Sequence, residues 1–364
     1  MNYVTSKIIK RMDNFKVRGN SKAKQRKILL PLSFGVSSMS LLHVLDQQLR
    51  IQTDRTSRTG YKLHVLYIDQ SSTDGQAAGS QHLNLIEEKY PSNTFSTILL
   101  EDAFAYLDHT DTLNGSSLGT SDESLNLLNA NSNTERLKSF LSSLPSATSK
   151  NDMINVLRTR AIVGFAKENG CDYVTWGDTT TRLAEKTLSE TAKGRGFSLP
   201  WQIADGPSPY GITFNFPMRD LLRKEVLTYA TLADPSLTPL TINQSISPQV
   251  SASSKDATVD DLMSQYFQSV EENFPSIVAN VVRTSSRLEA SRQYTAFTGN
   301  TLCNICGLPV DDYAQGLHGW GGDQEGISDK PAERSAETVQ SKIVCYGCAR
   351  SVHVTKDSIK DTES

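Results

Sequence analysis

Apolar and polar positions alternate in a regular way over the first hundred residues. Short apolar runs with the character of buried strands are followed by segments with helical spacing. The predicted strands are 27–33 (K-I-L-L-P-L-S), 61–69 (Y-K-L-H-V-L-Y-I-D) and 93–100, and the predicted helices are 37–49 and 80–90. Strand and helix in turn indicate a parallel sheet with helices on both faces. The pattern therefore predicts an α/β domain.

The same alternation resumes at residue 151. Residues 152–169 carry helical spacing and run into Gly170, a residue typical of a helix C-terminus. The later predicted elements are a strand at 171–177, a helix at 180–192, a loop leading into a short strand after Lys193, and helices at 220–231, 258–273 and 275–289. The predicted α/β domain therefore spans residues 27–232.

Two stretches interrupt the pattern. Residues 108–150 are rich in Ser, Thr, Asn and Gly, which predicts an insertion or mobile loop apart from a short helix at 134–142. Residues 233–257 hold many Ser, Thr and Pro and are interpreted as a linker. The remaining predicted regions are a basic N-terminal arm (1–26), a helical region with cysteine knuckles (258–350) and a tail (351–364).

Composition narrows the class of protein. The chain has 364 residues, of which 37% are hydrophobic, so it can bury a sizeable core. No stretch approaches the roughly 20 apolar residues of a membrane span. The first residues are too polar for a secretory signal. We expect a soluble cytoplasmic protein without membrane contact.

Charge is placed unevenly, although the formal net charge is only -3. Nine Lys or Arg residues stand between Lys7 and Lys27, against one acid, Asp13. Such an arm can neutralise RNA phosphates and release their counterions. A solvated, partly disordered leader explains the same charges equally well.

Four of the five cysteines form two C-x-x-C pairs, Cys303 with Cys306 and Cys345 with Cys348. Each such turn presents two thiolates to one ion, and two turns supply the four ligands of a closed tetrahedral zinc site. The alternatives are disulfides, which suit exported proteins, and a redox dithiol, which usually occurs as a single pair. The pattern predicts a structural zinc ion, with an insertion looping out between the pairs. The fifth cysteine, Cys171, is predicted to be a core residue.

Residues 29–38 turn from an apolar strand through Ser and Gly into a helix, a place where many proteins hold a phosphate. The stretch resembles the S-G-G-x-D-S loop of the PP-loop ATP-binding family, whose members adenylate a substrate before nitrogen or sulfur attacks. Ser33, Gly35 and Ser38 fall on matching positions, and the resemblance implies a nucleotide loop there. Phe34 stands in place of the first glycine, and Ser37 in place of the acid.

The resemblance extends to a second region. Arg158 and Arg160 fall where tRNA-thiolating members of the PP-loop family carry paired basic residues. The following strand leads to a segment similar to the G-H-N-x-D-D-x-A-E-T motif of those members. The A-E pair remains, but the histidine is absent and Thr181 and Arg182 replace the two aspartates.

These altered motifs, together with C-terminal rather than N-terminal C-x-x-C pairs, resemble the family of cytoplasmic tRNA 2-thiolation protein 2. The resemblance covers residues 25–105, 151–232 and 295–350. It implies a Rossmann-like PP-loop fold and a heterodimer with the catalytic tRNA 2-thiolation protein 1. That pair converts the wobble uridine of Lys, Glu and Gln tRNAs to its 2-thio form, with sulfur supplied as a thiocarboxylate on a ubiquitin-related modifier.

The substitutions indicate a weakened or absent adenylating site. A bulky Phe34 with ordinary backbone preferences hinders the close approach that a phosphate needs. Loss of the acid at Ser37 and of both aspartates removes the carboxylates that Mg²⁺ prefers and the charge neutralisation it supplies. No cysteine lies between Lys150 and Gly170 to carry sulfur. Whether the loop still holds ATP stays open at this point.

The basic residues remain, and the resemblance turns them into candidate tRNA phosphate contacts. They are Lys22, Lys24, Arg26, Lys27, Arg158, Arg160, Arg182, Lys186 and Arg195. The arm leads into the first strand, near the carboxyl edge of the sheet in sequence. We hypothesise a non-catalytic or weakly catalytic subunit that binds and orients tRNA. The rival hypotheses are a thiolase active by itself and a zinc-ribbon scaffold that does not contact RNA.

Overall fold

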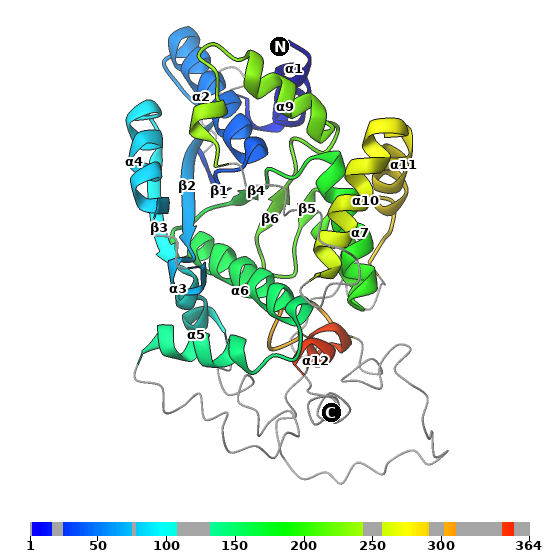
Figure 1. The fold of residues 1–364 in the computed structure, drawn as a ribbon. Coiled ribbons are helices and arrows are strands. Elements are labelled where there is room, and N and C mark those ends of the chain that lie inside the picture. Colours follow the sequence, from blue (N-terminus) through cyan, green and yellow to red (C-terminus); the bar gives the residue numbers. More distant parts are fainter. Residues whose placement is uncertain are drawn as a thin grey trace, which may run out of the picture.

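The computed structural model of the protein describes residues 2–16, 25–74, 78–107, 132–242, 257–290, 302–310 and 344–352. A six-stranded sheet in the order β3-β2-β1-β4-β6-β5 forms its centre (Figure 1). Its pairs are parallel except β5 with β6. The strands are β1 (Arg26–Leu32), β2 (Tyr61–Asp69), β3 (Thr94–Leu99), β4 (Tyr173–Thr175), β5 (Gly206–Pro207) and β6 (Thr213–Asn215). The predicted α/β fold with a parallel sheet is confirmed.

Side chains of the central strand alternate between two hydrophobic cores. Ile28, Leu30 and Leu32 face one core and Leu29 the other, as the period of two in a strand requires. The first core is completed by α1 (Asn2–Arg11), α2 (Val36–Thr56), α4 (Ala78–Lys89) and α9 (Arg223–Leu232). The second is completed by η2 (Leu100–Tyr106), α5 (Asn133–Ser142), α6 (Ala147–Glu168) and α7 (Thr180–Ala192). Helices therefore cover both faces of the sheet.

Local capping explains where the site-bearing helices begin. The Thr179 hydroxyl accepts a hydrogen bond from the backbone N–H of Arg182, so α7 starts directly after β4. Ser146 caps α6 in the same way through the N–H of Ser149, and Gly170, with φ of 60°, follows its end. Helix α7 therefore begins after the carboxyl end of β4, whereas the end of α6 leads to the start of β4.

The C-terminal helices add to the second core. Both α10 (Val259–Asn273) and α11 (Pro275–Ser285) pack on α7, and α12 (Tyr346–Val352) packs on α6 (Figure 1). The short elements are η1 (Asp13–Phe15), α3 (Ser71–Asp74), η7 (Gly196–Ser198), α8 (Leu199–Gln202) and η8 (Thr238–Leu240). The four paired cysteines belong to the same buried cluster as Leu29 and Phe214. The knuckle region therefore shares its core with the sheet.

Residues 2–16 form folded structure rather than the solvated leader that charge alone suggested. Val4, Ile8 and Met12 recur every four residues along α1 and are buried in the first core, followed by Phe15. The basic positions on the rest of the helix obscured this apolar stripe. Residues 17–24, in the remainder of the predicted arm, lie outside the described residues.

Other boundaries differ from the predictions in smaller ways. The predicted insertion at 108–150 includes α5 and the start of α6, whereas 108–131 lies outside the described residues. The loop predicted after Lys193 contains η7 and α8 before the short strands. Of the predicted linker, 243–256 lies outside the described residues. None of the helices in the described ranges has the length and apolarity to cross a bilayer.

Candidate functional site

The loop after β1 keeps the backbone path of a glycine but holds an aromatic side chain. Phe34 has φ of 57°, a left-handed conformation that costs an L-residue roughly 1–2 kcal/mol. Its ring is 2% exposed and lies 4.5 Å from the Tyr67 ring and 5.0 Å from the His82 ring, between centroids. The backbone N–H of Ile242 donates to its carbonyl at 3.0 Å. Phe34 therefore adopts the left-handed conformation at a cost, and its buried ring obstructs the loop.

The three residues matched to the nucleotide loop bond to one another. The Ser38 hydroxyl donates to the Gly35 carbonyl at 3.0 Å, and the Ser33 N–H donates to the Ser38 hydroxyl at 3.4 Å. The hydroxyls of Ser33 and Ser38 lie 3.3 Å apart. At the end of β4, a Cβ on Gly177 would lie 3.1 Å from Ser38 Cα, so this strand end packs against the first turn of α2. The polar groups of the loop therefore bond to one another, with Ser38 buried and Ser33 exposed.

Three of the predicted RNA-contacting residues meet at the carboxyl edge of the sheet. Arg158 on α6 donates to the side chain of Gln70, which follows β2, at 3.0 Å. Arg182 lies in the first turn of α7 with half of its side chain exposed and pairs with Glu185. Lys186 lies one turn further, with its amine 5.9 Å from the ring centre of Trp176, which follows β4. Burial lowers the pKa of Lys186.

Arg26 and Lys27 lie at the opposite edge, because they begin β1 rather than end it. The Arg26 guanidinium lies beside the contacting rings of Phe15 and Tyr173, 5.5 and 5.6 Å from their centres. Lys27 donates from its amine to the Asn169 carbonyl at the end of α6, at 2.8 Å. The strand spans roughly 20 Å at about 3.3 Å per residue, so these two residues are far from the Phe34 loop. Lys22 and Lys24 lie outside the described residues.

Arg195 is placed where RNA cannot reach it. Its side chain is 1% exposed, and its guanidinium donates to both carboxylate oxygens of Asp152, at 2.7 and 2.5 Å. The same guanidinium lies 3.6 Å from Cys348 Sγ. Burial opposes ionisation of Asp152, but Arg195 and then Lys193 outweigh it and lower the pKa of that carboxyl. The predicted RNA contact of Arg195 is therefore corrected to an internal ion pair.

Arg160 also faces the knuckle region. It donates to the backbone carbonyl of Tyr106 at 2.7 Å. A Cβ on Gly307 would lie 2.3 Å from Arg160 Nη1, so a side chain there would displace the arginine. Gly307 has φ of 74°, which suits the turn after Cys306. Together, Arg160 and Arg195 hold the two knuckles against α6 and the loop after α7.

The four cysteines form a compact set of potential metal ligands. Their Sγ atoms all lie within 4.8 Å of one another and are buried, and those of Cys306 and Cys345 are 3.8 Å apart. A tetrahedral ion with bonds of about 2.3 Å to sulfur places its ligands about 3.8 Å apart. The arrangement therefore fits one mononuclear ion. An iron–sulfur cube would put its own atoms between the thiolates and needs wider spacing.

Backbone and side-chain donors support the charged form of one thiol. Burial disfavours the thiolate of Cys303, but hydrogen bonds from the other three thiols and from the Cys345 N–H outweigh it and hold the pKa of Cys303 well below its usual value. The Cys345 N–H lies 3.3 Å from Cys303 Sγ. Tyr210 donates from its hydroxyl to the Cys306 carbonyl at 2.7 Å. Sequence reasoning missed Asp152 and Tyr210, because each contacts its partner across 43 or more residues.

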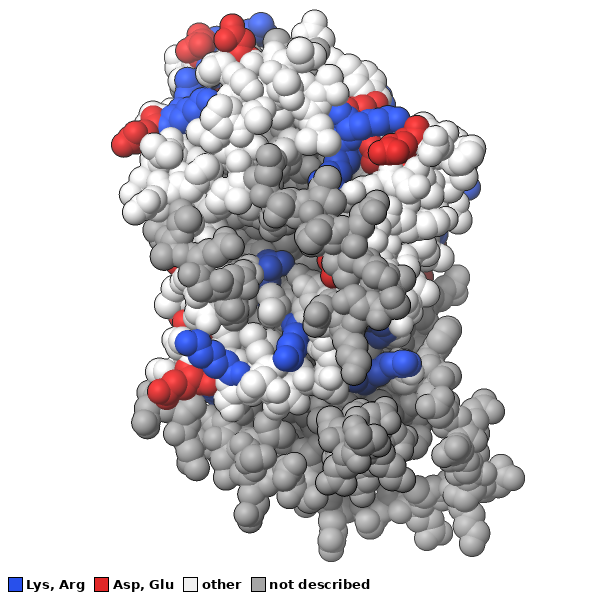
Figure 2. Space-filling model, in the orientation of Figure 1, with Lys and Arg blue, Asp and Glu red and all other residues white. Residues whose placement is uncertain are grey.

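A cavity of about 70 Å³ separates the cysteines from the ends of β4 and β6. Trp176, Lys186, Phe214 and Cys306 line it, and the Trp176 indole N–H has no hydrogen-bond partner among the described residues. Figure 2 shows several Lys and Arg side chains across the middle and lower part of this face, with fewer acids beside them. The β4–β6 half of the edge thus combines a cavity, aromatic rings and charges of both signs, because Asp152 and Glu190 line the cavity together with Lys186 and Arg195.

Comparison with known proteins agrees with this architecture. A family model described as "Cytoplasmic tRNA 2-thiolation protein 2" matches residues 258–350. A curated protein with that description from Phaeosphaeria nodorum is 48% identical over 352 residues, covering 96% of this chain and 87% of the relative. A relative from Pyrenophora tritici-repentis with the same description is 44% identical over 351 residues, covering 96% of this chain and 88% of the relative.

A solved thiolase structure is among those that share the fold. It is the U34-tRNA thiolase NcsA from Methanococcus maripaludis with its [4Fe-4S] cluster, with a TM-score of 0.51 and 17% identity. The match covers 84% of this chain and 86% of that chain. At this identity the likeness establishes the fold alone, and it agrees with the parallel sheet predicted for a PP-loop protein.

Proposed function

The chain belongs to the family of cytoplasmic tRNA 2-thiolation protein 2, and we propose that it is the non-catalytic subunit of a heterodimeric cytosolic tRNA thiolase. In this role it binds and positions Lys, Glu and Gln tRNAs. Its partner, the catalytic tRNA 2-thiolation protein 1, adenylates the wobble uridine and installs sulfur. The sulfur comes from a thiocarboxylated ubiquitin-related modifier.

The buried ring of Phe34 is the observation that carries the non-catalytic part of this proposal. A phosphate on this loop would need the space that Phe34, Tyr67 and His82 fill. It would also need the N–H and hydroxyl donors of Ser33 and Ser38, which already bond within the loop. Opening the loop would cost the packing of an aromatic side chain, about 3–5 kcal/mol for a Phe in a core.

The replaced acids support the same conclusion. Thr181 stands at one aspartate position, is fully buried, and donates its hydroxyl to the Glu271 carboxylate at 2.6 Å. Arg182, at the other, brings a positive charge to the place where a magnesium ligand would be. Neither side chain can neutralise a triphosphate by coordinating Mg²⁺.

The four-cysteine cluster would hold zinc as a structural ion. All four coordination positions are supplied by the chain, which leaves no open position for a substrate. When bound, zinc would stabilise the four thiolates and join the two knuckles. Arg195, beside Cys348, would offset the negative charge of a Zn–S₄ centre. This set differs in kind from a [4Fe-4S] cluster, whose cysteines need wider spacing.

The RNA-binding part of the proposal rests on Arg158, Arg182 and Lys186. They come from two helices, α6 and α7, and lie at one edge of the sheet. Their charges suit phosphates, which position an RNA without reading its bases. The predicted contacts at Lys22 and Lys24 remain part of the proposal.

Two measurements test the function. The isolated chain should show no ATP–pyrophosphate exchange, whereas the complex with the catalytic partner should show it. In a strain lacking the gene, mass spectrometry of Lys, Glu and Gln tRNAs should show loss of the 2-thio mark. Exchange by the chain alone would support the rival thiolase, and an intact mark in the deletion strain would reject the pathway.

A further inference from the structure

Helix α1 has two faces with different tasks. Val4, Ile8 and Met12 face the first core, and α1 contacts α2 and α9 there. Tyr3, Lys7 and Lys10 follow one another at intervals of four and three residues, so they form one stripe on another side of the helix. The stripe is about 10 Å long at 1.5 Å per residue. Burial of the apolar face fixes its position on the domain.

Ion pairs separate the basic residues of this region into two groups. Arg11 pairs with Asp205 at 3.3 Å and with Asp220 at 2.7 Å, and Lys16 pairs with Asp13 at 2.6 Å. Among the described residues, no acid pairs with Lys7 or Lys10. The Lys7 amine instead lies 5.4 Å from the Tyr3 ring centre. Arg11 and Lys16 form ion pairs within the fold, whereas the charges of Lys7 and Lys10 are available to a ligand.

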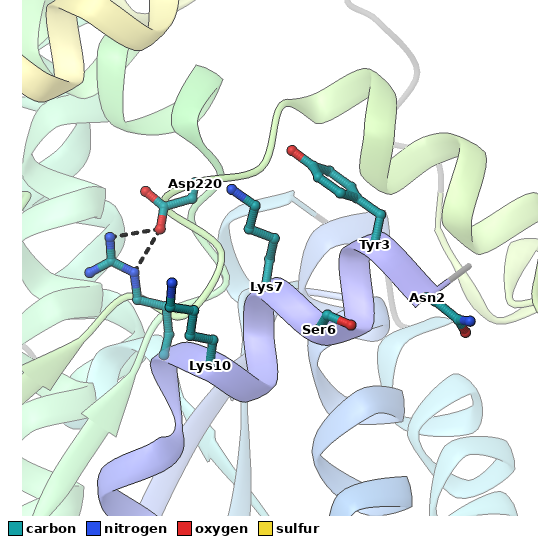
Figure 3. A pocket seen from close by; sticks show the side chains of 7 residues that line it. Asn2, Tyr3, Ser6, Lys7, Lys10 and Asp220 are labelled. Carbon is teal, nitrogen blue, oxygen red and sulfur yellow. Dashed lines mark hydrogen bonds and ion pairs between the residues drawn. The ribbon is translucent and has the colours of Figure 1, made fainter.

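These side chains line an open groove of about 740 Å³. Figure 3 shows Tyr3 and Lys7 extending to the same side of α1, with Asp220 at the end of the groove. The Asp220 carboxylate is already neutralised by the Arg11 guanidinium, so it adds little repulsion toward an anion. Tyr3 is 52% exposed, which leaves ring surface for a further contact.

The groove adjoins the start of α7. The Arg219 carbonyl, next to Asp220, accepts a hydrogen bond from the Thr180 hydroxyl at 2.7 Å. Arg182 follows two residues later on α7. The groove with Lys7 and Lys10 is therefore connected to Arg182, at the carboxyl edge, through Asp220, Arg219 and Thr180. This connection does not include the blocked Phe34 loop.

We propose that this groove binds a backbone segment of tRNA, with Lys7 and Lys10 contacting phosphates and Tyr3 stacking on an unpaired base. The inference rests on the proposed function, since it identifies one surface that holds the tRNA. The combination of cations with an exposed aromatic ring is the one used for sequence-tolerant binding of single-stranded segments. The surface includes no residue of the nucleotide loop or the cysteine cluster.

The test is a titration of unmodified Lys tRNA with the full-length chain, alone and with its partner, over a series of salt concentrations. The double variant Lys7→Gln and Lys10→Gln should lower the slope of log K against log salt by about 1 per lysine. Tyr3→Ala should weaken binding at least about fivefold, while Tyr3→Phe should bind as the parent does. Lys167→Gln, an exposed lysine in the last turn of α6, is the matched control and should change neither quantity.

The possible outcomes distinguish a failure of the groove proposal from a failure of the proposed function. Parent-like slopes in the double variant, with intact tRNA binding and unchanged thermal unfolding, would overturn the groove and leave the proposed function standing. Absence of tRNA binding by the parent, alone and in complex, would reject the RNA role itself. Binding of the groove to anionic phospholipid vesicles but not to tRNA would also overturn the inference.

Discussion

At the carboxyl ends of β1 and β2, Phe34 packs on Tyr67 and His82, and the serines beside it bond to one another. At the ends of β4 and β6, a cavity remains between Trp176, Lys186 and the cysteine knuckle, with Arg182 close by in the sequence. The first half is filled by the chain's own side chains, whereas the second keeps a cavity lined by aromatic and charged side chains. Under the proposed function, the first half would no longer hold a nucleotide, while Arg158, Arg182 and Lys186 would still contact RNA.

The largest expected effect concerns the cysteines that support the second half. Cys345→Ser should lose the metal and cause the greatest fall in unfolding temperature, because structural zinc contributes about 10 kcal/mol or more to folding in small zinc domains. Zinc per chain by mass spectrometry and thermal unfolding would measure this. Cys171→Ala, a buried cysteine outside the cluster, should keep its zinc. A Cys345→Ser protein with full zinc would refute the four-ligand site.

A smaller loss is expected when the buried ion pair beside the cluster is broken. Asp152→Ala leaves Arg195 charged and without its partner, which should lower the free energy of unfolding by about 3–5 kcal/mol. Asp220→Ala, at a pair whose side chains are about one third exposed or more, should cost no more than about 1 kcal/mol. Urea unfolding of both variants gives the comparison. Equal losses of unfolding free energy in the two variants would mean that burial does not make the Asp152–Arg195 pair contribute more than the exposed pair.

The first half, at the carboxyl ends of β1 and β2, can be tested by substitution of Phe34 itself. Phe34→Ala and Phe34→Gly both remove the ring, but glycine accepts φ of 57° without strain, so the glycine variant should be more stable by about 1 kcal/mol. Neither should gain ATP–pyrophosphate exchange, because the acids for Mg²⁺ are still missing. Chemical unfolding and the exchange assay measure the two expectations. Exchange restored by Phe34→Gly would show that the ring alone had silenced the site.

The smallest effect is a pH dependence in α2, behind the Phe34 loop. Burial, and then the charge of Lys89, lower the pKa of His43, whose ring lies 3.1 Å from the Tyr90 hydroxyl. The unfolded chain then binds more protons below pH of about 6.5, so stability should fall as pH drops through that value, by at most about 1.4 kcal/mol per unit. His43→Gln should flatten the dependence in unfolding experiments with excess zinc. An unchanged slope would assign it to other groups, among them His64, whose pKa burial also lowers.

Much of this architecture could be read from the sequence because the decisive signals are local. Strand 61–69 was predicted at its observed bounds, and helix 180–192 likewise, since apolar periodicity and the Thr179 cap lie within a few residues. The cysteine spacing predicted the group of four potential metal ligands for the same reason. Helix α1 was not predicted, because Lys7, Lys10 and Arg11 stand among its apolar positions and were interpreted as part of a charged arm.

The features that sequence could not supply are contacts between distant segments. The partner of Arg195 is Asp152, and nothing near either residue identifies the other. Arg26 and Lys27 are close to the nucleotide loop in sequence, but β1 lies between them and the loop, so the two sites are at opposite edges of the sheet. The conformation of Phe34 is also set from outside, by Tyr67, His82 and the Ile242 N–H.

The shared core of the knuckles and the sheet has a consequence for how the chain is made. Ser351 hydrogen-bonds to Asp152, a residue translated 199 positions earlier. During synthesis, the apolar side of α6 stays uncovered until the second knuckle has left the ribosome. With zinc at the proposed site, completion of the domain would require the ion to bind after both knuckles have left the ribosome, and the cell's metal supply would then limit the yield of folded protein.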